Sequence, residues 1–138
     1  MAKKLVLGLY TGCVDKLTAA GVVLSGAAAD DMDIEIFVFL MAAHAFKKEN
    51  AENNLHMAEL PEKREEFLAS LKNLQTPSWV EFFETAKEFT NVQVHVCSLA
   101  GKVWGGEKPE DFIDLVDDIC GIGEYIDACQ EADVNLFI

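Results

Sequence analysis

The stretch that decides the fold is Val92-Gln93-Val94-His95-Val96-Cys97, which is followed at once by Ser98-Leu99-Ala100-Gly101. The first six residues are rich in β-branched side chains and predict a buried strand, which the next four end. In an open parallel sheet, ligand-binding and catalytic groups gather just beyond the carboxyl ends of the strands. We therefore expect Cys97 at the functional edge of a sheet, where a partly exposed thiol can act as a thiolate. The alternative is a buried cysteine that only fills space.

Strand and helix signals alternate along the rest of the chain. Apolar runs predict further strands at 5–10, 34–40 and 134–138. Apolar residues at helical spacing predict helices between them, and a polar stretch at 49–61 is expected to be mobile. In the first half of the chain the expected helices are 16–29, with Asp15 as its cap, and a short helix or structured loop at 41–48. Further helices are expected to start at Pro61 and at Pro77, the latter with Thr76 as its cap. The last two are expected from Pro109 to about Cys120 and around 125–129. This alternation predicts an α/β layered sheet with right-handed crossovers.

Length and composition limit the classes of protein that fit. A chain of 138 residues with 51% hydrophobic residues predicts a single domain, 1–138, with a real core. The net charge of −13 argues against nucleic acid and anionic membranes as partners. No apolar run approaches the ~20 residues that cross a bilayer, and the apolar start lacks a cleavage pattern. We therefore expect a cytoplasmic protein, in which four cysteines without CxxC spacing stay reduced.

Three groups of residues together resemble the DsrE/DsrF-like superfamily of sulfur-relay proteins. They are the opening strand 5–10 with its small-residue helix, the strand 36–40 leading to Phe46-Lys47-Lys48, and the segment from Val94 to Ser98 with 111–114, 121–126 and 134–138 behind it. The resemblance implies a three-layer α/β/α fold with a mostly parallel sheet of about five strands, one of them near Ile119-Cys120. It also implies assembly with further copies of itself, as a trimer or hexamer. Residues 49–76 match no family motif.

The resemblance assigns a role to Cys97. Sulfur-carrying members hold a persulfide on a cysteine after the matching strand and pass the sulfane sulfur to a partner's cysteine, which implies donor and acceptor proteins as partners. Turn amides and a helix beginning after Ser98 would favour the thiolate at Cys97. Cys13 follows the first strand and could act as a second thiol if the two strand ends converge, although a simple loop residue is the alternative. Cys120 raises the same question, and Cys129 is expected to pack in the core.

Two aromatic side chains complete the list of candidate supporting residues. His44 follows the second strand and could reach the sheet edge as a base, or could be a solvated loop residue. Trp104, among glycines in an expected flexible loop, is a candidate lid or partner contact, with simple packing as the alternative. His95 shares a strand face with Cys97, but same-face neighbours lie ~6.5 Å apart along a strand, which favours a structural histidine. No metal ligand set is expected, because a site built from Cys13, His44 and Cys97 has no support in spacing.

Three functions compete at this stage. The first is an intracellular sulfur carrier or sulfurtransferase-like subunit that uses Cys97. The second is a non-catalytic oligomeric binding or regulatory module of the same fold. The third, a flavodoxin-like flavin protein, is disfavoured because Cys13-Val14-Asp15-Lys16 supplies few phosphate donors and places a carboxylate nearby. We therefore expect no cofactor.

Overall fold

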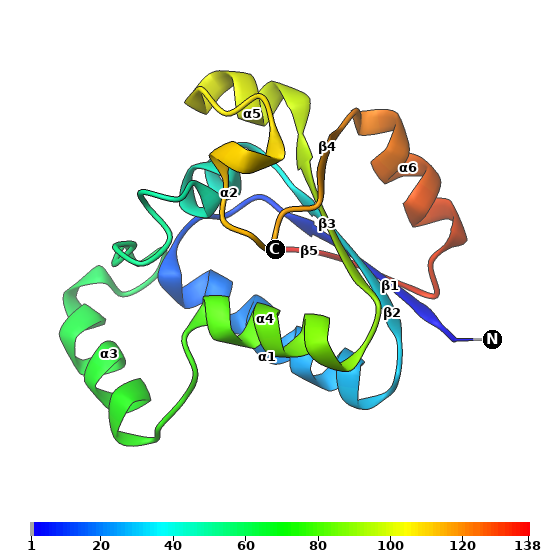
Figure 1. Ribbon diagram of the computed structural model, residues 1–138. Helices are drawn as coiled ribbons and strands as arrows, with labels where there is room; N and C mark the ends of the chain where they lie inside the picture. The colour runs from blue at the N-terminus through cyan, green and yellow to red at the C-terminus, as the bar shows by residue number, and fades with distance from the viewer. Residues whose placement is uncertain (1) are drawn as a thin grey trace.

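The computed structural model describes residues 2–138 and contains a five-stranded parallel sheet (Figure 1). The spatial order is β4-β3-β2-β1-β5, so the chain builds the sheet outward from β1 in one direction and returns to the other side with its last strand. The strands are β1 (Lys4–Leu9), β2 (Asp33–Val38), β3 (Val92–Cys97), β4 (Asp118–Cys120) and β5 (Val134–Phe137). All four predicted strands are confirmed, and so is the strand near Ile119-Cys120 that the family resemblance implied.

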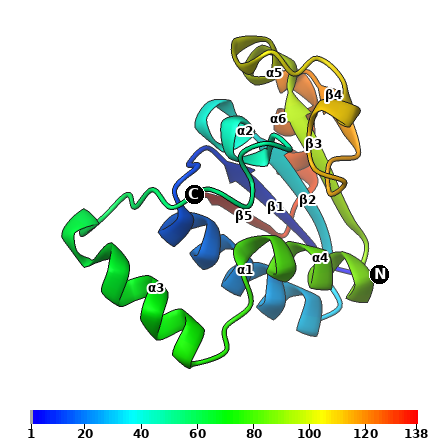
Figure 2. The same ribbon diagram turned by 60° about the vertical axis from the view of Figure 1, so that its left-hand side comes forward.

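Helices cover both faces of the sheet and its carboxyl edge, which gives a three-layer α/β/α fold (Figures 1 and 2). One face carries α1 (Val14–Ala29) and α4 (Trp79–Phe89), and the other carries α6 (Ile122–Glu131). The short helices α2 (Leu40–Phe46) and α5 (Ser98–Trp104) lie at the carboxyl edge, with α3 (Arg64–Asn73) and the short turns η1 (Pro61–Lys63) and η2 (Pro109–Asp111) in the connections. No helix in the described part is long and apolar enough to cross a membrane.

The main core lies between the sheet and the α1–α4 pair. Alternate residues of β3 point into it, so Val92, Val94 and Val96 are buried while the residues between them face α6. Helix α1 is built from small residues and approaches α4 closely. A Cβ on Gly21 would lie only 2.6 Å from the Cβ of Phe82, so glycine sets the distance between the two helices.

The structure corrects three local predictions. The expected helix from Pro109 to about Cys120 is wrong, because only η2 is helical there and the chain then runs through a loop into β4. The cap of α1 is Cys13 rather than Asp15, whose carboxylate instead accepts the N–H groups of residues 58 and 59. The cap of α4 is Ser78 rather than Thr76, since Ser78 and Glu81 form a reciprocal capping box.

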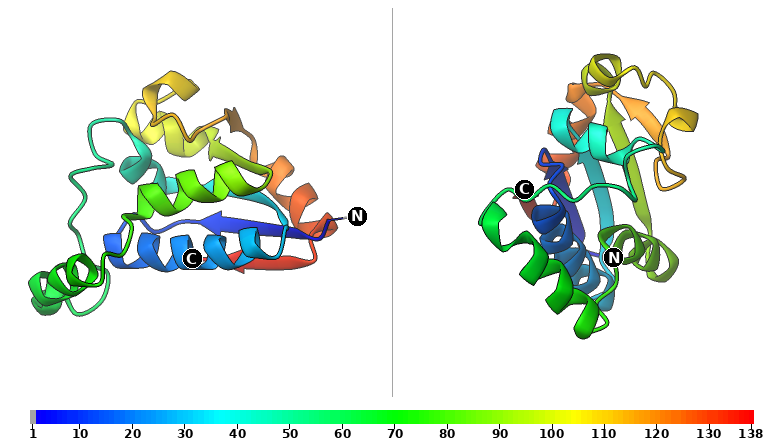
Figure 3. Two further views of the ribbon diagram at one scale, coloured as in Figure 1. Left: turned by 60° about the horizontal axis from the view of Figure 1, so that its bottom comes forward. Right: turned by 90° about the vertical axis from the view of Figure 1, so that its left-hand side faces the viewer.

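Helix α3 projects from the rest of the molecule (Figure 3), and its residue Leu68 packs against the main core. The expected start at Pro61 is confirmed, because η1 begins there and leads into α3. Although its apolar residues share one face, none of them is buried, and Leu74 is 76% exposed. The segment before it is not free of contacts, since the backbone N–H of Val14 donates to the carbonyl of His56.

Candidate thiol site

Two cysteine thiols end neighbouring strands at the carboxyl edge of the sheet. Cys97 is the last residue of β3 and Cys120 is the last residue of β4, and the two are paired in register. Residues paired across neighbouring strands point to the same face and lie ~4.8 Å apart. Cys97 is partly exposed, whereas Cys120 is buried with 5% of its surface accessible. The structure therefore brings together the predicted site cysteine and one of its two candidate thiol partners.

The buried member of the pair is held in its protonated form. Burial raises the pKa of the Cys120 thiol to about 12, and the nearby charges of Glu124, Cys97, Asp118 and Glu35 act in the same direction. At neutral pH this side chain is a thiol, which can donate a weak S–H hydrogen bond and is a poor nucleophile. Cys97 is exposed enough to react with a donor, whereas Cys120 is buried and held protonated.

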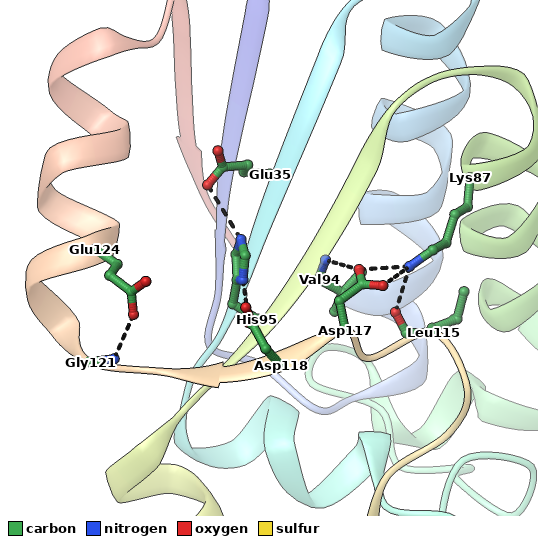
Figure 4. A network of polar contacts seen from close by, with 9 residues as sticks. All are labelled: Glu35, Lys87, Val94, His95, Leu115, Asp117, Asp118, Gly121 and Glu124. Carbon is green, nitrogen blue, oxygen red and sulfur yellow. Dashed lines mark hydrogen bonds and ion pairs between the residues drawn. The ribbon is translucent and has the colours of Figure 1, made fainter. Parts of the chain in front are cut away.

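His95, two residues before Cys97 on the same strand face, is held between two carboxylates (Figure 4). Its Nδ1 lies 2.5 Å from Oδ1 of Asp118, and its Nε2 lies 3.4 Å from Oε2 of Glu35. Glu35 also pairs with Lys4, at 2.7 Å, so the charges form a row across four strands. Both ring nitrogens are engaged away from the thiols, which makes His95 a structural residue that fixes β4 against β3.

Asp117 provides the second attachment of β4 to the sheet (Figure 4). Its Oδ2 accepts the backbone N–H of Val94 at 2.8 Å and lies 2.7 Å from Nζ of Lys87, while its own N–H donates to the carbonyl of Val94. The same lysine donates to the carbonyl of Leu115 at 3.0 Å. These contacts fix Asp117, the residue directly before β4. Because β4 has only three residues, they also hold Cys120 in register with Cys97.

The other predicted supporting residues form a separate cavity of about 330 Å³ at the carboxyl ends of β1 and β2. Cys13, His44 and Trp104 line it, and Cys97 does not. The rings of His44 and Trp104 meet edge to face with centroids 4.6 Å apart. Cys13 belongs to the loop after β1, and β2 lies between β1 and β3, so the strands that precede the two thiols are two strand spacings, ~10 Å, apart.

Ser98 and Trp104 mark the two ends of α5. Ser98 is its exposed first residue, directly after Cys97. Trp104 was expected in a flexible loop, but it ends this helix, and its indole N–H donates to the carbonyl of Leu40 at 2.7 Å. The tryptophan therefore joins α5 to α2. Gly105 follows with φ of +75°, which glycine adopts without strain, and so ends the helix.

Residues 2–138 contain no group of three or more His, Cys, Asp or Glu side chains that could hold a metal ion. Over the same range the four cysteines are free thiols. Their positions differ: Cys97 and Cys120 are adjacent, Cys13 lines the separate cavity, and Cys129 packs beside the apolar cluster under α6.

Comparison with solved structures gives a match over the entire chain. The YchN protein from E. coli superimposes with a TM-score of 0.59, covering 100% of both chains at 15% sequence identity. The two proteins share a DsrE-like fold. No family model matches this chain, and neither does any curated protein sequence. The fold that the sequence resemblance implied is therefore confirmed, and the similarity at this level of identity concerns the fold alone.

Sequence reasoning missed the carboxylates that shape the site. Glu35, Asp117 and Asp118 were not singled out, although they hold His95 and β4 in place. A signal was present in the pair Asp117-Asp118 directly before Ile119-Cys120, which repeats the strand-to-cysteine pattern of Cys97 in shorter form. The helical spacing of the preceding apolar residues concealed it.

Proposed function

We propose that the protein is a sulfur carrier that holds a persulfide on Cys97 and passes the sulfane sulfur to a thiol of a partner. The observation that supports this most directly is the partly exposed Cys97 at the carboxyl edge, in register with a buried thiol that burial keeps protonated. An S–H donor beside Cys97 would stabilise an anionic outer sulfur without competing for it. Cytoplasmic thiols stay reduced, and the proposal places the protein in that compartment.

The proposed reaction consists of two displacements at sulfur. The Cys97 thiolate attacks the sulfane sulfur of a polysulfide or of a donor's persulfide, an S–S bond to Cys97 forms, and the donor leaves as a thiolate. A thiolate of the acceptor then attacks the outer sulfur, and Cys97 is released as a thiolate. Each step exchanges one S–S bond for another, so it needs no external oxidant or metal.

The surface around Cys97 is suited to a protein donor or acceptor. Leu99 and Val103 on α5 are 61% and 54% exposed, and Met41 on the neighbouring α2 is 49% exposed. Apolar side chains exposed together at one edge are typical of protein contact surfaces. We include them in the proposal as the docking surface for the sulfur donor or acceptor, which would bring its own thiol to Cys97.

A non-catalytic oligomeric module is the second candidate, and a different surface favours it. The edge strand β5 is exposed along its whole length, with Phe137 63% exposed, and α6 exposes Ile122 and Ile126 beside the same sheet face. An unpaired strand edge with apolar side chains is suited to contact with further copies of the chain. Oligomer formation through this surface, as a trimer or hexamer, is also compatible with a sulfur carrier.

Mass spectrometry of protein treated with polysulfide separates the two candidates. The carrier predicts a gain of ~32 Da on the peptide that contains Cys97, reversed by reducing agent. The adduct should be absent in Cys97→Ser and present in the matched control Cys13→Ser, since Cys13 lies in the separate cavity. A correctly folded protein that gains no sulfur at Cys97 would leave the binding module as the better account.

A further inference from the structure

We propose that Cys120 is the resolving thiol of Cys97: it displaces the sulfur that Cys97 carries and closes a disulfide between the ends of β3 and β4. The inference rests on the proposed function, because it concerns the fate of the same persulfide. It limits the lifetime of the persulfide. A persulfide that meets no acceptor is eventually lost, and the two thiols are then joined in a disulfide.

The geometry of the two strand ends permits this bond. Paired residues on neighbouring strands have Cα atoms ~4.8 Å apart, within the ~4.4–6.8 Å that disulfides span. The alternation along β3 and β4 assigns both residues to the sheet face that carries α6, where Cys120 belongs to the apolar cluster, and Cys97, at the end of its strand, also packs against the main core. β4 is a three-residue edge strand paired only with β3 in the described sheet, so the relation between the two thiols depends on no third strand.

The other two thiols lack this relation to Cys97. Cys13 belongs to the loop after β1, which β2 separates from β3. Cys129 lies in the last turn of α6, beside Tyr125. Among the described thiols only Cys120 is paired in strand register with Cys97, so the pairing is specific.

The proposed step balances in atoms and electrons. The proton of the Cys120 thiol passes to the anionic outer sulfur, and the Cys120 Sγ attacks the Sγ of Cys97 in the persulfide. The bond between the two cysteine sulfurs forms, the bond from Cys97 to the outer sulfur breaks, and hydrosulfide leaves. The outer sulfur gains two electrons, and each cysteine sulfur loses one. The sulfane sulfur itself is therefore the oxidant.

The surroundings of Cys120 set a slow rate for this step. Glu124 on α6, Asp118 on β4, Glu35 on β2 and Cys97 on β3 face the thiol, and together with burial they raise its pKa to about 12. The attacking thiolate is scarce at neutral pH and increases about tenfold for each pH unit below that pKa. A loaded Cys97 therefore has time to meet an acceptor before it is discharged.

The test follows loaded protein after excess polysulfide has been removed. Wild type should lose its persulfide with release of one equivalent of hydrosulfide and end at a mass ~2 Da below the reduced chain, which is the signature of an internal disulfide. The rate should differ by less than about twofold between about pH 7 and about pH 8, because the proton that Cys120 loses is the one that the leaving hydrosulfide gains. Cys120→Ser, and Cys120→Ala as a second variant, should keep the persulfide at least tenfold longer, while Cys129→Ser should behave like wild type.

A second experiment tests whether the Cys97 and Cys120 thiols can form a disulfide when no persulfide is present. Reduced protein treated with the thiol oxidant diamide should yield a peptide linked through Cys97 and Cys120. Equal persulfide lifetimes in wild type and both Cys120 variants, or a link to Cys13 in place of Cys120, would overturn the resolving role. Failure of Cys97 to load at all would refute the proposed function and the discharge step together, so the two failures are distinguishable.

Discussion

Replacing Cys120 with alanine should weaken the pH dependence of the protein's stability in alkaline solution. The thiol has an ordinary pKa of 9.0, which the unfolded chain should approach, and burial in the folded chain raises it to about 12. Below the lower value both states are protonated and the fold has its full stability. Above it the unfolded chain loses a proton that the folded chain keeps, so the free energy of unfolding falls as the pH rises toward the folded pKa.

The size of this effect follows from the two pKa values. Between about pH 8 and about pH 10, wild type should lose at most about 1.4 kcal/mol more unfolding free energy than Cys120→Ala. Tyr125, whose pKa is raised to about 12 chiefly by burial, contributes a loss of the same sign but is present in both proteins and cancels. Urea denaturation at the two pH values, with reductant, measures the difference.

The matched control for this comparison is Cys13→Ala. It removes a thiol that makes no side-chain cap bond to α1, and it leaves the Cys97–Cys120 pair intact. The control should therefore keep the wild-type pH dependence. If Cys120→Ala loses as much stability as wild type between the two pH values, the fold does not hold the Cys120 thiol in its protonated form. That result would refute the distinction between a protonated Cys120 and a reactive Cys97.

Three further substitutions test the packing and the backbone. Gly21→Val should cost about 1–3 kcal/mol in urea denaturation, because its Cβ would meet Phe82 at 2.6 Å; unchanged stability would contradict the close helix contact. Asp31→Gly should raise stability by about 1 kcal/mol in thermal unfolding, since φ is +56° there and the carboxylate follows a helix C-terminus; a loss would contradict this. Asp117→Ala should cost about 1–3 kcal/mol by leaving the N–H of Val94 without its acceptor, and it should accelerate alkylation of the buried thiol on β4; an unchanged alkylation rate would count against the anchoring role.

The strands of the sheet could be predicted from local patterns with one exception. β1 and β2 are inner strands with apolar runs, β3 has buried valines at alternate positions, and the run at the end of the chain predicted β5 as well. β4 was obscured because Phe112, Leu115, Val116 and Ile119 have helical spacing, although the first three are buried from a loop. Spacing of apolar residues reports burial, and a loop folded onto a core can produce it without a helix.

Only part of the site could be predicted from the sequence. A strand followed by a turn predicted that Cys97 would stand at the carboxyl edge, which the structure confirms. The pairing of Cys97 with Cys120 depends on the order of the strands, which is set by contacts far apart in the chain. The same holds for the carboxylates around His95, since Glu35 and Asp118 come from the two neighbouring strands.

Transfer of sulfur from Cys97 is the central claim, and a single-turnover transfer assay tests it most directly. Protein loaded with isotopically labelled sulfane sulfur would be mixed with a thiol acceptor, and the label would be followed from the Cys97 peptide to the acceptor. The account predicts transfer of one labelled sulfur for each loaded Cys97, with none from Cys97→Ser. Label that stays on the protein while the acceptor remains unlabelled, or equal transfer from Cys97→Ser, would contradict it.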